Sequence, residues 1–314
     1  MADGRQGVQI IGGANLDPRG SRLEELVRAA QVAREVEVRQ SANGVRFATF
    51  GETGVPDLDL DRMLEAVPPA IGAALGANTY YFVPLALRES AEPEEPEGFA
   101  KKASQSPEHA MVARAWTDEL GESAICHRNV ELGSGHRGVF ISTRLMSDRF
   151  ALSFEFFINV AHAFVDATGV PESFAELVWQ QALDGVRGET SLDAWESRNL
   201  ALGREPNAQP EETRSRRSFT AKARPFSREE TVAADHATQV IDEKERGLYV
   251  ESAFSDAVAI YLLSLALDFD YSELREREYP LLAPAALAAR LKMVAEMFPP
   301  NPGYQFSVRY RRRA

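Results

Sequence analysis

Cysteine is almost absent from this sequence, since Cys126 is the only one among 314 residues. A single thiol cannot form a disulfide within the chain, and it cannot supply a multi-cysteine zinc site. Histidine is also scarce, with five in total, which leaves few ligand sets for a metal ion. These shortages exclude disulfide-stapled secreted folds and cysteine-rich zinc modules, and they indicate a reducing compartment.

Long apolar runs and an excess of positive charge are missing as well. The sequence contains no run of about 18 apolar residues, so no membrane span is predicted. The first residues, MADGRQGVQII, lack the basic and apolar regions of a secretory signal. The formal net charge of -12 disfavours broad binding to nucleic acid or anionic lipid. We therefore expect a soluble cytoplasmic protein that has a protein partner and no membrane span.

The pattern of the chain predicts an α+β fold in two parts. Residues 89–98, ESAEPEEPEG, are acidic and proline-rich, and such a segment cannot bury apolar area. We place a boundary there, between an α/β region over 1–98 and a helix-rich domain with a small sheet over 99–314. A polar stretch at 203–228 is predicted to be a mobile loop.

Apolar residues at three- and four-residue spacing predict the main helices, and short runs rich in branched and aromatic residues predict strands. Helices are predicted at 23–35, 60–75 (broken at Pro68-Pro69), 107–120, 151–168, 247–267 and 283–298. Strands are predicted at 36–40, 45–50, 79–87, 123–132 and 137–143.

The first segment with chemical content is FEFFINVAHAFVD, residues 154–166. His162 lies one helical turn after Ile158 and one turn before Asp166. A carboxylate four residues on can accept a hydrogen bond from the imidazole and raise its basicity. The plainer interpretation is a histidine at the edge of the core, satisfied by Asp166.

The second segment is YVESAFSDAVAIY, residues 249–261, a mostly apolar helix that carries Glu251, Ser255 and Asp256. Carboxylates in apolar surroundings are costly unless they are paired or bound to a metal. His162 and Asp166 are the predicted partners.

Together these segments resemble the zincin fold of metallopeptidases, and most closely the gluzincin group with its thermolysin-like and anthrax-lethal-factor-like domains. The resemblance rests on a helix ending His-Ala-x-x-Asp, strand-like segments before it, and a later helix with Glu and Ser-Asp. In that family two histidines at i and i+4 bind zinc, and the glutamate after the first is the general base. A glutamate on a later helix is the third ligand, and an acidic residue one turn on orients a ligating histidine.

Position by position, the resemblance implies that His162 is the second zinc ligand and Asp256 the orienting acid. Ile158 falls where the first ligand belongs, and a hydrocarbon cannot bind a metal. Asn159 falls where the general base belongs, and a neutral amide cannot take a proton from zinc-bound water. The two positions that define the catalytic motif are therefore replaced.

The position of the third ligand is ambiguous. The family spacing points to Ser252, whereas the nearest carboxylate is Glu251, one residue early, and a shift to use it would lose the match at Asp256. We expect no cofactor; a rebuilt zinc site would combine His162, Glu251 and His136.

The sequence thus predicts a catalytically degenerate zincin-like protein that acts as a binding or structural module and not as a zinc peptidase of the usual kind. An alternative is a metal-dependent hydrolase with a site rearranged around His162 and Glu251. A third interpretation is an accidental resemblance, with the polar residues forming only a buried network. The predicted cleft consists of His162, Asp166, Glu251, Ser252, Asp256 and Asn159.

Overall fold

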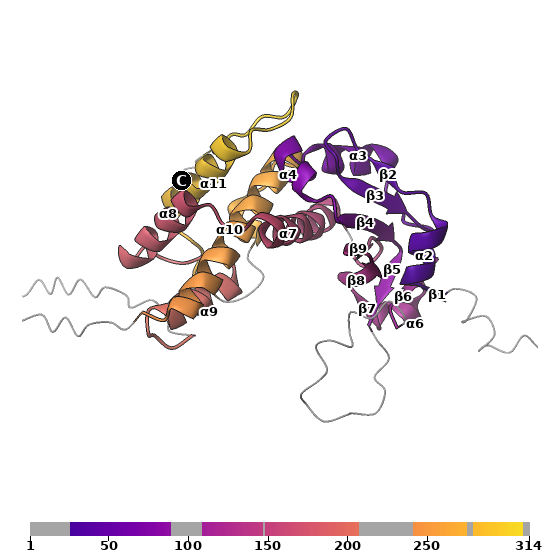
Figure 1. Ribbon diagram of the computed structural model, residues 1–314, viewed down its shortest axis with the longest axis horizontal. Helices are drawn as coiled ribbons and strands as arrows, with labels where there is room; N and C mark the ends of the chain where they lie inside the picture. Colours follow the sequence, from indigo (N-terminus) through magenta and orange to yellow (C-terminus); the bar gives the residue numbers. More distant parts are fainter. Residues whose placement is uncertain (1–25, 89–108, 147, 207–240, 275–278, 310–314) are drawn as a thin grey trace, which may run out of the picture. The chain divides into compact units, whose positions relative to one another are not determined.

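A computed structural model describes residues 26–88, 109–146, 148–206, 241–274 and 279–309. It confirms the predicted α+β class, with two sheets and a set of longer helices (Figure 1). The chain divides into two compact units, which we describe separately. Unit 1 comprises residues 1–38, 47–54 and 79–146, and unit 2 comprises residues 39–46, 55–78 and 147–314.

The sheets are built from strands in the first half of the chain. One sheet has the order β1-β6-β5-β7 and the other β2-β3-β4-β9-β8. The strands are β1 (Leu26–Arg28), β2 (Arg39–Gln40), β3 (Arg46–Thr49), β4 (Asn78–Val83), β5 (Leu85–Leu87), β6 (Met111–Ala113), β7 (Ala124–Ile125), β8 (His127–Gly133) and β9 (His136–Ser142). β2 belongs to unit 2 and the other strands lie wholly or mainly in unit 1, together with the short helices α2 (Ala29–Glu35) and α6 (Asp118–Gly121).

The core of unit 1 forms where α2 packs against β8. Tyr81 on β4 and Phe140 on β9 stack with their ring centroids 4.5 Å apart. Because successive strand residues point to opposite faces, the alternating apolar residues of these strands supply one continuous buried layer. The predicted strands at 79–87, 123–132 and 137–143 agree to within one residue at each end with β4 and β5, with β7 and β8, and with β9.

Two predicted helices of this region are wrong in part, for one shared reason. Leu26–Arg28 and Met111–Ala113 both lie in predicted helices, but they pair as the antiparallel strands β1 and β6. Their local pattern fits a helix, yet β1 forms a ladder by pairing with β6, and β6 lies between β1 and β5. Tertiary pairing overrides local propensity here.

The predicted domain boundary at residue 98 lies outside the described residues. β5 precedes that segment and β6 follows it, and the two strands pair within one sheet. The compact units therefore do not follow the chain as two consecutive blocks. The predicted loop at 203–228 lies outside the described residues from 207 onward.

Unit 2 is helical, with α10 packed against four other helices (Figure 1). The neighbours of α10 are α7, α8, α9 and α11. The helices of this unit are α3 (Asp57–Glu65), α4 (Pro69–Ala74), α7 (Arg149–Thr168), α8 (Glu172–Leu183), α9 (Leu192–Ala201), α10 (Glu243–Ala266), α11 (Pro284–Met297) and the 3-10 turn η1 (Tyr271–Leu274). The break predicted at Pro68-Pro69 is confirmed, since Pro69 opens α4 where a missing N–H costs nothing.

The ends of α7 and α10 follow from their sequences. Asp148 accepts a hydrogen bond from the Ala151 N–H and caps the start of α7, and Gly169 ends it with a positive φ of 70°. Asp242 caps α10 by accepting from the N–H groups of Lys244 and Glu245. These caps satisfy free N–H groups at the start of both helices and so define where each helix begins.

Aromatic side chains pack α10 against α7 and α8. Phe254 is fully buried and contacts Phe174 of α8 at 4.7 Å and Phe164 of α7 at 6.4 Å between ring centroids. Such tilted ring pairs add about 0.5–1.5 kcal/mol each to the burial of apolar area. This packing fixes the faces of α7 and α10 that form the site described below.

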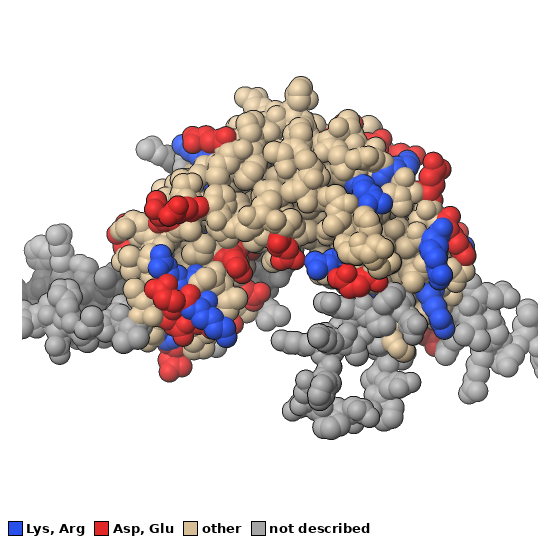
Figure 2. All heavy atoms as spheres, viewed as in Figure 1, with Lys and Arg blue, Asp and Glu red and all other residues tan. Residues whose placement is uncertain are grey.

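Two helices, α7 and α10, are long and apolar enough to cross a membrane by length and composition, but their apolar windows are mostly buried in the structure. Core helices have the same property, so this is weak evidence for a membrane protein. On the face that Figure 2 shows, basic side chains occur among acidic ones. This face displays no broad basic surface over the described residues, in keeping with the net negative charge.

Candidate functional site

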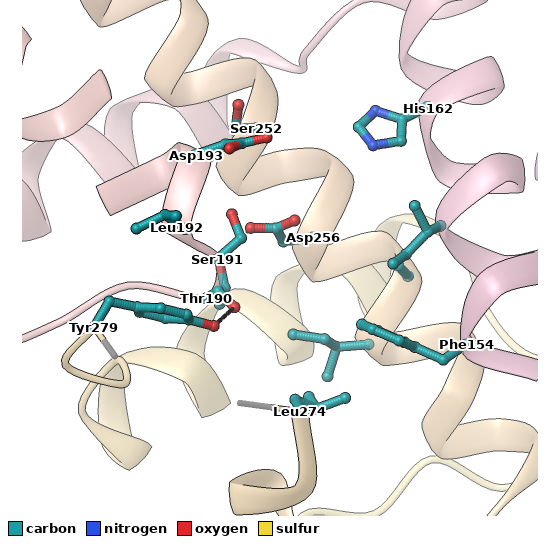
Figure 3. A pocket seen from close by; sticks show the side chains of 13 residues that line it. Phe154, His162, Thr190, Ser191, Leu192, Asp193, Ser252, Asp256, Leu274 and Tyr279 are labelled. Carbon is teal, nitrogen blue, oxygen red and sulfur yellow. Dashed lines mark hydrogen bonds between the residues drawn. The ribbon is translucent and has the colours of Figure 1, made fainter. Parts of the chain in front are cut away.

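A pocket of about 330 Å³ lies in unit 2, where α7, α10 and the start of α9 approach one another (Figure 3). We call it the α7–α10 pocket. It is lined by Phe154, Ile158, His162, Thr190, Ser191, Leu192, Asp193, Ser252, Asp256, Ala259, Ile260, Leu274 and Tyr279. Its volume is at the lower end of the range for small-molecule sites.

The α7 side of the pocket is formed by Phe154, Ile158 and His162. Their four-residue spacing places them on one face of the helix. The Nδ1 atom of His162 lies 3.0 Å from Oγ of Ser255, a buried residue of α10. This contact fixes the orientation of the imidazole ring, which contributes the polar end of an otherwise apolar wall.

The α10 side presents Ser252, Asp256, Ala259 and Ile260, again at helical spacing. Asp256 lies on the face of α10 that carries the pocket, with its carboxylate directed toward Ser191 (Figure 3). The Thr190 hydroxyl donates a hydrogen bond of 2.7 Å to Oδ2 of Asp256.

The pKa of Asp256 is raised to about 6. Loss of hydration is the largest cause, and hydrogen bonds from Ser191 and Thr190 counteract it because they stabilise the ionised form. The nearby Glu189 carboxylate raises the pKa further, while Arg290 lowers it. Asp256 is therefore mainly ionised at neutral pH but can take a proton in mildly acidic solution.

The third wall comes from the start of α9. Ser191 is the N-cap of this helix and accepts a hydrogen bond of 3.2 Å from the Ala194 N–H. Asp193 lies in the first turn, at the exposed rim of the pocket. The Tyr279 hydroxyl donates to the backbone oxygen of Thr190 at 2.9 Å, so the tyrosine ring is held against this wall.

A buried ionic cluster supports that wall from behind. Glu189 is fully buried, and its carboxylate pairs with Arg290 at 2.9 Å and with Arg198 at 3.0 Å. The Tyr249 hydroxyl donates to Glu189 at 2.7 Å, and the Gln181 oxygen accepts from Arg290 at 2.8 Å. Because every one of these bonds is withdrawn from water, the cluster fixes the segment that carries Thr190 and Ser191.

Gly188 fits this segment against the chain before α11. Its φ is +78°, and an added Cβ would overlap the carbonyl of Leu281. Only glycine allows both the left-handed conformation and this close approach. The backbone of Glu189 then bonds to Pro280 and Leu282, which completes the support of the wall.

The predicted cleft residues divide into two groups. His162, Ser252 and Asp256 come together in the α7–α10 pocket. Asp166 and Glu251 are exposed, and they are not among the residues that line it. For Glu251 the reason is the one-residue offset from Ser252, which turns its side chain by about 100° around α10.

Asn159 is also outside the lining, since it is buried on another face of α7. Its amide nitrogen donates to the backbone oxygen of Glu155 at 2.9 Å and to the Glu155 carboxylate at 3.2 Å. Asn159, which the resemblance to zincins aligns with the general base, thus bonds within its own helix. Ile158, which the resemblance aligns with the first ligand, lines the pocket.

The residues predicted for a rebuilt zinc site, His162, Glu251 and His136, do not all belong to one unit. His136 lies in unit 1, at the exposed start of β9, and Glu251 is outside the pocket. Within the described ranges, no group of three or more His, Cys, Asp and Glu side chains is placed to hold a metal ion.

Several residues of the site are absent from the sequence-based prediction, namely Phe154, Thr190, Ser191, Asp193 and Tyr279. A serine immediately before a helical stretch is an N-cap signal that could have marked Ser191. Arg290, inside the apolar stretch that forms α11, could have indicated a buried ion pair. Nothing in the local sequence indicates that Tyr279 returns to this site.

Comparison with known proteins does not place the chain in a family, since no protein-family model, curated protein or solved structure matches it.

Proposed function

We propose that this protein acts by binding a ligand in the α7–α10 pocket, and that it is a zincin-like protein without conventional zinc catalysis. The observation that carries the proposal is the make-up of the pocket. His162, Ser252 and Asp256 line it, while the position of the first zinc ligand contributes the hydrocarbon side chain of Ile158. A concave site with apolar walls and a few converging polar groups is typical of ligand binding.

The kinship with zincins in this proposal rests on the resemblance of the two sequence segments. The engagement of Asn159 with Glu155 supports the loss of the general base. The single cysteine and the net charge support a cytoplasmic protein whose partner is another protein.

The experiment that tests the binding proposal uses two adjacent substitutions on α10. Ser252 is half-buried and lines the pocket, so Ser252→Trp should fill the space without removing a core side chain. Glu251 is exposed and outside the lining, so Glu251→Trp adds the same indole to the same helix away from the pocket. We expect fragments detected by ligand-observed NMR on the wild-type chain to lose their binding signal with Ser252→Trp only.

Fragments that bind wild type, Ser252→Trp and Glu251→Trp equally, or a fragment library with no binder to the wild-type chain, would contradict the proposal. Thermal unfolding of both variants provides the control for folding. The two melting temperatures should agree to within a few degrees, because neither substitution opens a cavity.

A hydrolase with a rearranged site is the second candidate, and one observation favours it. An imidazole and a carboxylate face the same pocket at His162 and Asp256, and such a pair can move a proton during hydrolysis. The zinc content of the purified chain separates a metal-dependent version of this hydrolase from the binding proposal.

A further inference from the structure

The polar and apolar residues of the α7–α10 pocket are arranged unevenly, and this arrangement indicates the chemistry of its ligand. Figure 3 shows Ser191, Asp193, Ser252 and Asp256 gathered at one end, whereas Phe154 and Leu274 lie at the other. Ile158 and Ile260 add to the apolar lining. A ligand that fits this division needs a polar end and a hydrocarbon body.

Two carboxylates belong to the polar end. Among the described residues that line the pocket, Asp193 and Asp256 are the carboxylates and His162 is the basic side chain. An anionic ligand at Asp256 would lie next to a carboxylate. A cation would compensate the Asp256 carboxylate, which has lost much of its hydration.

Two further contacts prepare the pocket for a cation. The hydroxyls of Thr190 and Ser191 both donate toward Asp256, so they stabilise the ionised carboxylate before a ligand arrives. Tyr279 is held by its hydrogen bond to the Thr190 backbone and is one of the lining residues, and aromatic rings attract positive charge.

We propose that the ligand of this pocket is a small organic amine, with its ammonium group at Asp256 and its apolar body between Phe154, Ile158 and Leu274. This inference rests on the proposed function, since it names the ligand class of the same site. The pocket volume of about 330 Å³ corresponds to roughly ten water-sized volumes. A primary amine on a single ring or a short branched chain fits that size.

Three probes of one shape test the ligand class, namely 3-phenylpropylamine, 3-phenylpropan-1-ol and 3-phenylpropanoate. They carry the same phenylpropyl body and differ in charge, so their dissociation constants for the full chain report the preference of the polar end. A charge-assisted hydrogen bond to Asp256 should make the amine bind about tenfold more tightly than the alcohol. The carboxylate should bind most weakly.

Asp256→Asn is the variant that assigns the preference to one residue. It removes the charge and keeps the size, so the amine should lose its advantage over the alcohol while the alcohol still binds. Asp184→Asn is the matched control, because Asp184 is exposed at the end of α8 and does not line the pocket. The control should keep the full preference for the amine.

The pH dependence gives a second readout that a purely structural effect would not produce. The pKa of Asp256 is about 6, so its attraction for an amine should be present at pH 7.5 and weaken as the pH falls toward 5. Among the described residues, the titratable and charged groups near Asp256 are His162, Asp193, Glu189 and Arg290. Asp256→Asn removes the carboxylate, so the part of the pH dependence that this variant loses belongs to Asp256.

Amine binding about tenfold tighter than alcohol binding, lost in Asp256→Asn and weaker at pH 5, supports the inference. It is overturned if the alcohol or the carboxylate binds as tightly as the amine, if Asp256→Asn keeps the preference, or if no probe binds at millimolar concentration. The comparison of Ser252→Trp with Glu251→Trp still decides whether the pocket binds ligands, so the two proposals can fail separately.

Discussion

Replacing Glu189 with alanine should cost about 3–5 kcal/mol of the free energy of unfolding, or prevent folding of unit 2 altogether. Glu189 is fully buried and pairs with Arg290 and Arg198, which are 0% and 3% exposed. The alanine would leave two guanidinium groups in the interior without their carboxylate. An uncompensated buried charge is far more costly than the loss of an exposed ion pair.

The control for this effect is Glu131→Ala. Glu131 pairs with Arg137 at 3.3 Å on the exposed hairpin of β8 and β9, and both side chains are well exposed. Exposed pairs of this kind contribute about 0–1 kcal/mol. Urea unfolding gives the free energy of unfolding of both variants. A loss below about 1 kcal/mol for Glu189→Ala would show that the buried ionic cluster does not stabilise the wall of the pocket.

The second large effect is expected at Gly188. Gly188→Ala places a Cβ in overlap with the Leu281 carbonyl and also forces alanine into a φ of +78°. Gly185 has a similar φ of +67°, but an added Cβ there meets no atom within 4 Å. Gly185→Ala should therefore cost about 1 kcal/mol from the backbone conformation alone.

Gly188→Ala should cost at least about 2 kcal/mol more than Gly185→Ala, since the chain before α11 must move to relieve the overlap. Urea unfolding gives the free energy of unfolding of both variants. Because both glycines have a positive φ, the difference between the two losses reports the overlap of the added Cβ with Leu281. Equal losses would mean that the approach of Gly188 to Leu281 does not constrain the fold. Gly188→Ala should also weaken ligand binding, because the displaced segment carries Thr190 and Ser191.

The elements that could be predicted from the sequence are those whose pattern is local. α7 and α11 each bury a stripe of apolar residues at helical spacing, which periodicity predicts, and α10 is a long run that is apolar on nearly all sides. β1 and β6 could not be predicted in this way. Each is a three-residue strand that depends on pairing with distant segments, since β1 pairs with β6 more than 80 residues away and β6 pairs with both β1 and β5.

The site residues likewise divide into those that a local pattern predicts and those that only the tertiary arrangement brings in. His162 and Asp256 were predicted to converge because each is a titratable residue on a long apolar helix, and polar groups in such surroundings need partners. Ser191, Asp193 and Tyr279 enter the pocket through the tertiary arrangement of α9 and the segment before α11. Periodicity carries no information on that arrangement, so the third wall could not be predicted.

The zinc content of the purified full chain tests the central claim most directly. Elemental analysis should be made on wild type and on His162→Ala, prepared without chelator in zinc-supplemented medium. We expect far less than one zinc per chain in both preparations, because the proposed resemblance to zincins puts the hydrocarbon side chain of Ile158 at the position of the first zinc ligand. One tightly bound zinc per wild-type chain, lost in His162→Ala, would contradict the account and favour the metal-dependent hydrolase.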